Sequence, residues 1–142
     1  KRNGANLVIL NRTPQRAREL AKLVNAEDFG GLEQVALIAS ADILIDATPV
    51  EIWSGINQPI VRQELLHPKL VVFDVNYNPK QTKLLTDAKA AGCTIVYGYT
   101  MFLYQAARQF ELFTGRQAPL SEMASALDKA LGESHATHTN RG

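Results

Sequence analysis

Short apolar runs recur along the chain, and their spacing predicts a set of β-strands. Residues 7–10, 43–47, 71–75 and 94–96 are nearly all aliphatic or β-branched. Runs of this length and composition are typical of strands that are covered on both faces, as in a parallel sheet. Residues 27–29 form a shorter segment, which is expected to add a minor edge strand.

The segments between these runs repeat their apolar residues at helical spacing. Thr13 and Pro14 open the first helix, since threonine is a good N-cap residue and proline suits the first helical position. The apolar residues at positions 17, 20, 21 and 24 then share one helical face. Further helices are expected over residues 32–39, 80–91, 99–113 and 120–131. Gly92 is expected to end the helix over residues 80–91, and Gly115 the helix over residues 99–113.

Strands that alternate with helices predict an α/β fold, specifically a Rossmann-like doubly wound parallel sheet in a three-layer arrangement. In such sheets, ligands bind beyond the carboxyl ends of the strands. We expect one domain over residues 1–132 and a polar, flexible tail over residues 133–142.

The pattern begins at what corresponds to the second strand of such a fold. Residues 1–6 resemble the end of a helix and a turn, with Gly4 suited to the left-handed conformation. In the usual strand order 3-2-1-4-5-6, the first strand lies at the centre, so this chain is expected to lack its central strand. The neighbouring edges would expose unpaired backbone and favour aggregation. We therefore expect more protein upstream, and poor folding without it.

Composition excludes several classes of function. Hydrophobic residues make up 46% of the chain and charged residues 20%, which is ordinary for a globular protein. Fifteen basic residues against 14 acidic residues leave no basic field for nucleic acid, and no apolar run is long enough to cross a membrane. The single cysteine and the three histidines form no metal-binding pattern. A cytoplasmic location is the expectation.

The first strand end carries a candidate site for an anionic cofactor. Asn11, Arg12 and Thr13 follow the strand directly, and Arg16 lies one helical turn further on. In a dinucleotide-binding fold, a carboxylate at this position binds the ribose hydroxyl of NAD, whereas an arginine accommodates the 2′-phosphate of NADP. The sequence has Arg12 here and no acidic residue beside it. Locally, a capped helix with solvated arginines is an equally good interpretation.

The next two strand ends carry short proline-containing turns. Ala47, Thr48, Pro49 and Val50 close the second main strand, and taken alone they are best explained as a strand terminator. Tyr77 follows the third strand and is held near Pro79, so its hydroxyl can point into a crevice. An exposed loop tyrosine is the commoner outcome for this pattern.

The fourth strand end leads from Gly98 into a helix. Glycine lets a backbone approach a flat ligand closely. Gln105 lies four residues after Met101 and three after Phe102, so it shares their helical face. A polar amide on an apolar face needs a partner, which is either the protein backbone or a substrate.

Together these four sites resemble the shikimate dehydrogenase family over residues 7–131. The resemblance implies NADP as cofactor and shikimate or 3-dehydroshikimate as substrate. It assigns Tyr77 and Gln105 to the substrate. It assigns the cofactor to Asn11, Arg12, Thr13, Arg16, Ala47, Thr48, Pro49, Val50, Val75, Gly98 and Met101.

In that family, NADPH delivers hydride to a ketone, and a lysine–aspartate pair in an N-terminal domain handles the proton. Neither member of the pair is identified here, nor is the glycine-rich G-x-G-x-x-G turn, so no catalytic residue is assigned and the chain alone is expected to be inactive. The family resemblance also extends to plant-type enzymes that are fused to a dehydroquinate dehydratase. The oligomeric state is left open.

Two departures from the family pattern keep alternatives open. Glu51 stands in place of a glycine, and Asn76 in place of an apolar residue before the tyrosine. A quinate/shikimate-type dehydrogenase with an altered substrate is therefore a second hypothesis. A non-catalytic NADP-binding module is a third, and an upstream substrate domain with a lysine and an aspartate would exclude it.

Overall fold

The structure is a computed structural model that describes residues 4–49 and 60–138, with side chains described up to residue 132. The predicted Val50, Glu51 and the loop that follows them lie outside the described residues.

Five short strands form two parallel sheets. In the first sheet, β1 (Val8–Leu10) pairs with β2 (Asp28–Gly30). In the second, β4 (Val71–Asp74) lies between β3 (Ile43–Asp46) and β5 (Thr94–Tyr97). All pairings are parallel, and the strands fall where the apolar runs predict them. The α/β fold class is therefore confirmed.

The helices differ from the sequence prediction in three ways. The segment after β2 is a 3-10 helix rather than an α-helix. The helix expected over residues 80–91 begins at Lys83. The last helix continues beyond residue 131, into the segment that was expected to form a flexible tail. The helical elements are α1 (Pro14–Val24), η1 (Leu32–Ser40), η2 (Gln63–Leu65), α3 (Lys83–Ala90), α4 (Gly98–Thr114) and α5 (Leu120–His138).

The predicted cap of α1 is also different. Thr13 occupies the N-cap position, but its hydroxyl makes no capping bond. The side chain of Asn11 binds the backbone instead, with Oδ1 accepting from the amide of Thr13 at 2.8 Å. Pro14 lies at the first helical position as expected, and the helix ends at Asn25 in the left-handed conformation.

The main core lies on one face of the β3–β4–β5 sheet. Leu70, Val72, Leu85 and Ala88 have no exposed surface, and they join β4 to α3, while Ile38 packs into the same cluster from η1. Alternation along a strand places every second side chain on the same face, so the opposite face carries a different set.

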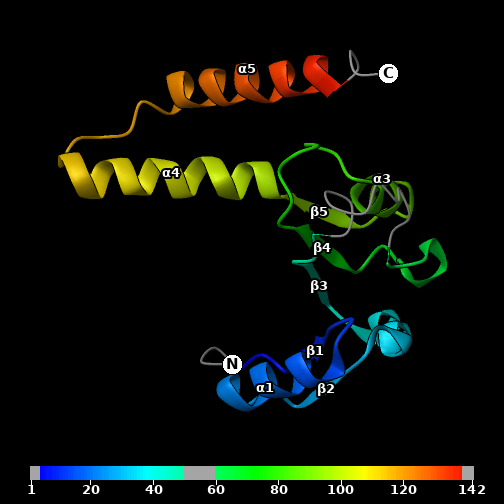
Figure 1. Cartoon of the computed structure of the whole chain (residues 1–142). Coiled ribbons are helices and arrows are strands. Elements are labelled where there is room, and N and C mark those ends of the chain that lie inside the picture. The colour runs from blue at the N-terminus through cyan, green and yellow to red at the C-terminus, as the bar shows by residue number, and fades with distance from the viewer. Residues whose placement is uncertain (1–3, 50–59, 139–142) are drawn as a thin grey trace.

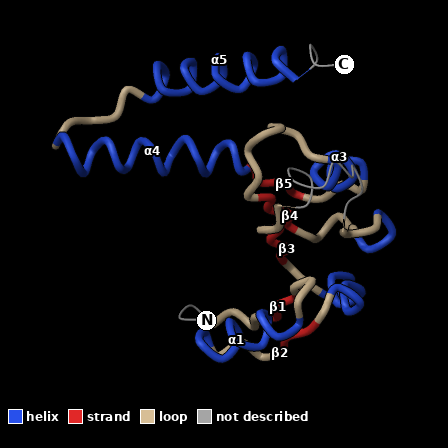
Figure 2. The backbone as a smooth tube through the Cα atoms, viewed as in Figure 1, coloured by secondary structure: helices blue, strands red, loops and turns tan. Residues whose placement is uncertain are grey.

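That opposite face is open among the described residues. Ile43 is 60% exposed and Ile45 58%, and Val96 projects from the same face two strands away. The strands β1 and β3 do not pair with each other, so each is an edge (Figure 2). In a complete doubly wound sheet, a strand between β1 and β3 would pair with both of these edges, and its helix would cover the open face.

Beyond β5, the chain forms a helical hairpin. Figure 1 shows α4 leaving the end of β5 and extending away from the sheet, with α5 running back alongside it. Gly115 ends α4 in the left-handed conformation that favours glycine. The hairpin brings α5 back toward the end of β5.

The open sheet face predicts self-association of the 142-residue chain. We expect concentration-dependent oligomers in sedimentation velocity, and fewer of them for Ile43→Thr/Ile45→Thr, because threonine keeps the strand propensity and removes apolar surface. Leu23→Thr is the matched control, since Leu23 is 82% exposed but lies on α1. A monodisperse wild-type monomer with a cooperative melt would contradict this account of the open face.

Candidate functional site

The candidate site is built from residues that directly follow four strands. The turns after β1, β3 and β4 and the first residue of α4 after β5 carry the motifs that the sequence singled out. In the second sheet the strands are parallel and in register, with Asp46 opposite Asp74 and Asp74 opposite Tyr97. Their carboxyl ends therefore lie side by side.

Two arginines near the end of β1 are exposed to solvent. Arg12 and Arg16 are exposed, and within residues 4–49 and 60–132 neither guanidinium forms an ion pair. The first turn of α1 contains no acidic residue. The N-terminus of a helix carries partial positive charge and favours anions. This end of β1 therefore offers two cations and a helix N-terminus that has no carboxylate in its first turn.

Asn11 gives the same turn its shape. Its backbone amide donates to the carbonyl of Gly30 at 3.1 Å and so joins the ends of β1 and β2. Its side chain accepts from the amide of Thr13, as described above. Asn11 therefore fixes the backbone that carries Arg12, and the side chain of Thr13 remains exposed.

The end of β3 is shaped by a carboxylate. Asp46 Oδ1 accepts from the backbone amide of Thr48 at 2.9 Å, which tightens the turn. Burial raises the pKa of Asp46, the bonds from Thr48 lower it, and the nearby charge of Asp74 raises it, with a net upward shift. Ala47 and Pro49 are exposed beside this turn.

The end of β4 repeats this turn around a deeper carboxylate. Asp74 is 1% exposed, and its Oδ1 accepts from the backbone amide of Asn76 at 2.9 Å and from the Asn76 side chain at 2.8 Å. Asp74 Oδ2 accepts from the hydroxyl of Thr82 at 2.6 Å. Thr82 is the N-cap of α3, and its Oγ1 accepts from the amide of Leu85. One carboxylate thus ties β4 to the start of α3.

The ends of β3 and β4 are also joined to each other. The side-chain amide of Asn76 donates to the backbone carbonyl of Thr48 at 3.0 Å. The sequence prediction did not include Asp74, Thr82 or this bond. The available signal was the recurrence of an aspartate at the same place in two successive strands, Asp46 and Asp74.

Tyr77 lies beside the start of α4. Its ring stacks on Phe102 with 4.5 Å between the centroids and 22° between the planes. Tyr77 keeps 39% of its surface exposed. It is thus an exposed tyrosine, but one whose ring is positioned by a contact to α4 rather than free in a loop.

Gly98 lies against the backbone of the β4 turn. A Cβ atom at residue 98 would overlap the carbonyl groups of Val75 and Asn76, so only glycine fits. The close approach that Gly98 permits in this structure is therefore to the chain's own backbone. Along α4, Met101 and Gln105 are both exposed. Gln105 therefore does not belong to the core of the residues that the structure describes.

A polar cluster joins α5 to the same region. Asp128 Oδ1 accepts from Lys80 Nζ and from the Tyr99 hydroxyl, both at 2.5 Å, and Lys80 Nζ lies 4.3 Å from the centroid of the Tyr99 ring. The bond from Lys80 is the main cause that lowers the pKa of Asp128, and the bond to Asp128 raises the pKa of Tyr99. The sequence prediction did not include this cluster, because its members lie far apart in the chain.

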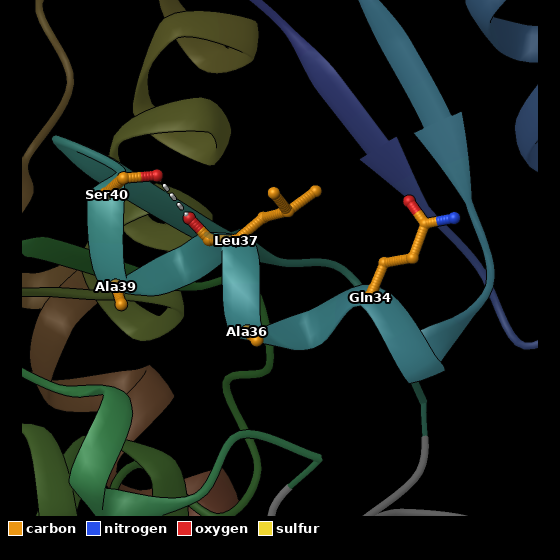
Figure 3. Close-up of a pocket in the computed structure, with 5 residues that line it drawn as sticks. All are labelled: Gln34, Ala36, Leu37, Ala39 and Ser40. Carbon is orange, nitrogen blue, oxygen red and sulfur yellow. Dashed lines mark hydrogen bonds between the residues drawn. The ribbon is translucent and has the colours of Figure 1, made fainter.

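One open hollow, of about 460 Å³, lies elsewhere, on η1 (Figure 3). None of the strand-end residues borders it, so it takes no part in the candidate site. Its lining residues all come from this one helix and are Gln34, Ala36, Leu37, Ala39 and Ser40. Within the described ranges, no three histidine, cysteine or acidic side chains are grouped as metal ligands, and no helix is long and apolar enough to span a membrane.

Known proteins that are similar to this chain in sequence and structure include shikimate dehydrogenases. Residues 98–127 match the family model described as the shikimate 5′-dehydrogenase C-terminal domain. A shikimate dehydrogenase (NADP(+)) from Methanobrevibacter smithii is 42% identical over 139 residues, which cover 92% of this chain and 50% of the relative. The chain spans about half the length of the curated relatives that it matches.

Solved structures agree with this comparison. The shikimate 5-dehydrogenase of Thermus thermophilus in complex with NADP(H) and shikimate matches with a TM-score of 0.74 and 30% identity, over 91% of this chain and 48% of that one. The quinate dehydrogenase of Corynebacterium glutamicum in complex with NAD matches with a TM-score of 0.75 and 30% identity, over 87% of this chain and 46% of that one.

The Asp128 cluster predicts a pH-dependent contribution to stability. Because the pKa of Asp128 is lowered in the folded state, its contribution is fully present above the ordinary aspartate pKa and is lost as the pH falls through the lowered value. Asp128→Asn should therefore lower the unfolding midpoint slightly at pH 7, and the difference from wild type should begin to shrink below about pH 4 and vanish once the pH lies below the lowered pKa of the folded state. Asp42→Asn, which removes an exposed carboxylate outside the cluster, is the control. A difference that is constant with pH would contradict the assigned role of the charge.

Proposed function

Because this chain belongs to the shikimate dehydrogenase family, we propose that it supplies the NADP-binding half of an enzyme that reduces 3-dehydroshikimate to shikimate with NADPH. The observation that carries the cofactor assignment is the pair of exposed arginines after β1, which have no acidic partner among the described residues. The relatives' names support the activity, and they describe proteins of about twice this length.

The residues at the end of β1 fit a phosphorylated ribose. Arg12 can donate two parallel hydrogen bonds to a phosphate and stack its planar guanidinium on an adenine ring. Arg16 and the positive end of the α1 helix dipole add positive potential near the same turn. Asn11, Thr13 and the turn of Ala47, Thr48, Pro49 and Val50 complete the proposed cofactor contacts, with Val75, Gly98 and Met101 placed toward the nicotinamide.

On the substrate side, we assign two polar groups. Tyr77 is exposed and held by its stack on Phe102, and Gln105 is exposed on α4, one helical turn beyond Met101. A phenol and an amide are suited to bind the hydroxyl groups of a polyhydroxylated ring. When bound, NADPH supplies the hydride; this chain's residues orient the two molecules. Proton transfer is assigned to a lysine–aspartate pair outside this chain.

The proposal includes a partner segment. The chain spans about half the length of its relatives. Among the described residues, β1 and β3 each have one edge without a strand partner, and one face of the second sheet is open. A preceding domain that adds a strand between β1 and β3 and a helix on the open face would complete the doubly wound sheet. On this proposal the 142 residues alone are inactive, because the acid–base pair is missing.

A quinate-type dehydrogenase is the second candidate. The quinate dehydrogenase structure resembles this chain as closely as the shikimate enzyme does, with TM-scores of 0.75 and 0.74. That structure contains NAD, whereas Arg12 favours NADP. Turnover of quinate against shikimate, with each cofactor, separates the two hypotheses. Preference for quinate would replace the substrate assignment and leave the fold and the cofactor turn as described.

Exchanging the charge at residue 12 tests the cofactor assignment. In the complete protein, Arg12→Asp should weaken NADP binding about 10–100-fold, because it removes a charge-assisted phosphate bond worth roughly 1.5–3 kcal/mol and adds repulsion. NAD binding should change much less. Arg18→Asp makes the same charge change on the exposed surface of α1 and is the matched control. Equal losses of NADP and NAD affinity, measured by calorimetry, would overturn the assignment.

A further inference from the structure

Asn76 is buried, and both of its side-chain donors are used inside the protein. The residue is 8% exposed, and its Nδ2 lies 2.8 Å from Asp74 Oδ1 and 3.0 Å from the carbonyl oxygen of Thr48. A primary amide has two N–H groups, so these two bonds account for both. Both donors of the side chain are therefore directed into the protein. It joins two strand ends.

The bond to Thr48 lies where the two strands cease to pair. The last backbone bond between β3 and β4 runs from the amide of Val75 to the carbonyl of Asp46 at 3.0 Å. Beyond it, within the described residues, the Asn76 side chain makes the next cross-link, to the turn that contains Thr48. An apolar side chain of similar size would fill the space but could not donate, and the carbonyl of Thr48 and the carboxylate of Asp74 would each lose a partner.

The backbone of Asn76 is enclosed at the same time. Gly98 packs against its carbonyl group so closely that no Cβ atom fits between them. The next residue, Tyr77, stacks on Phe102 of α4. Asn76 thus contacts the turn after β3 through its side chain and the start of α4 through its backbone. Asn76 therefore connects the Thr48 turn to Tyr77, its neighbour in the chain.

We infer that Asn76 is a positioning residue that sets the spacing between the cofactor turn at Thr48 and the substrate tyrosine at Tyr77. This inference rests on the proposed function, which assigns the Thr48 turn to NADP and Tyr77 to the substrate. It gives this residue a role in coupling the two binding events. Since coupling is reciprocal, bound shikimate must tighten NADPH binding by the same factor as NADPH tightens shikimate binding.

The test measures this coupling in the complete protein. NADPH fluorescence gives the Kd of NADPH without and with saturating shikimate, a pair that cannot react because both are reduced. We expect at least about a fivefold tightening in the wild type. In Asn76→Val the tightening should fall to less than twofold and kcat should drop, while the Kd of NADPH alone changes little.

Thr82→Val is the matched control. It removes a hydrogen bond to the same buried carboxylate and also a cap of α3, yet it leaves the Asn76–Thr48 bond in place. It should lower the melting temperature and keep the coupling. Equal loss of coupling in both variants would reduce Asn76 to a structural role and overturn the inference.

Asn76→Ser keeps the test decisive if the valine variant does not fold. A serine hydroxyl has only one donor and a shorter side chain, so it cannot bond both to the carboxylate of Asp74 and to the carbonyl of Thr48. Coupling should therefore again fall to less than twofold. Coupling that persists at the wild-type level in this variant contradicts the inference.

The remaining outcomes separate this inference from the proposed function. If the wild type binds NADPH and shikimate independently, the positioning role is wrong while the enzyme assignment stands. If the wild type binds no NADPH, the proposed function fails, and the positioning role fails with it.

Discussion

The buried carboxylate of Asp74 is the constraint around which the strand ends are organised. Removing a charged group from water costs several kcal/mol unless hydrogen bonds replace the lost hydration. Here Asn76 supplies two donors and Thr82 a third. Those donors lie on the turn after β4 and at the first turn of α3, so the turn and the helix must take one relative position to satisfy the charge. The bond from Asn76 to Thr48 extends the same constraint to the end of β3.

The two sheets differ in the charged groups that lie at the carboxyl ends of their strands. The second sheet ends in two carboxylates, Asp46 and Asp74, that are turned inward and used to shape backbone. After the first sheet, Arg12 follows β1 and Arg16 lies in α1; both are exposed and form no ion pair among the described residues. On the proposed function, the arginines attract the anionic cofactor, and the inward carboxylates leave backbone and uncharged side chains for the polyhydroxylated substrate.

Much of the fold was predictable because the apolar runs are short and sharply bounded. All four main strands were located within one or two residues, and the parallel sheet follows from their alternation with helices. The errors have local causes. Thr13 makes no capping bond with its side chain because the amide of Arg16 already donates to its backbone carbonyl, while Asn11 accepts from the amide of Thr13. The start of α3 moved to Lys83 because Thr82 is held by Asp74. A carboxylate network of this kind depends on strand register, which a single sequence does not specify.

The candidate site was predicted in outline and not in its internal connections. Arg12, Tyr77 and Gln105 could be selected because each follows a strand end or shares a helical face with apolar neighbours. In the sequence, Asn76 was only a departure from the family pattern that left the identity of the substrate open. In the structure, its side chain bonds to Thr48 and Asp74. The cluster of Lys80, Tyr99 and Asp128 could not be found, because three elements must first be packed to bring the residues together.

A crystal structure of the complete protein with NADP and shikimate bound is the most direct test of this account. The account predicts the 2′-phosphate within hydrogen-bonding distance of the Arg12 guanidinium at the start of α1. Shikimate should contact the Tyr77 hydroxyl and the Gln105 amide, with the side chain of Asn76 still bonded to the carbonyl of Thr48. A 2′-phosphate held by other residues, or a substrate that lies away from Tyr77 and Gln105, would contradict it.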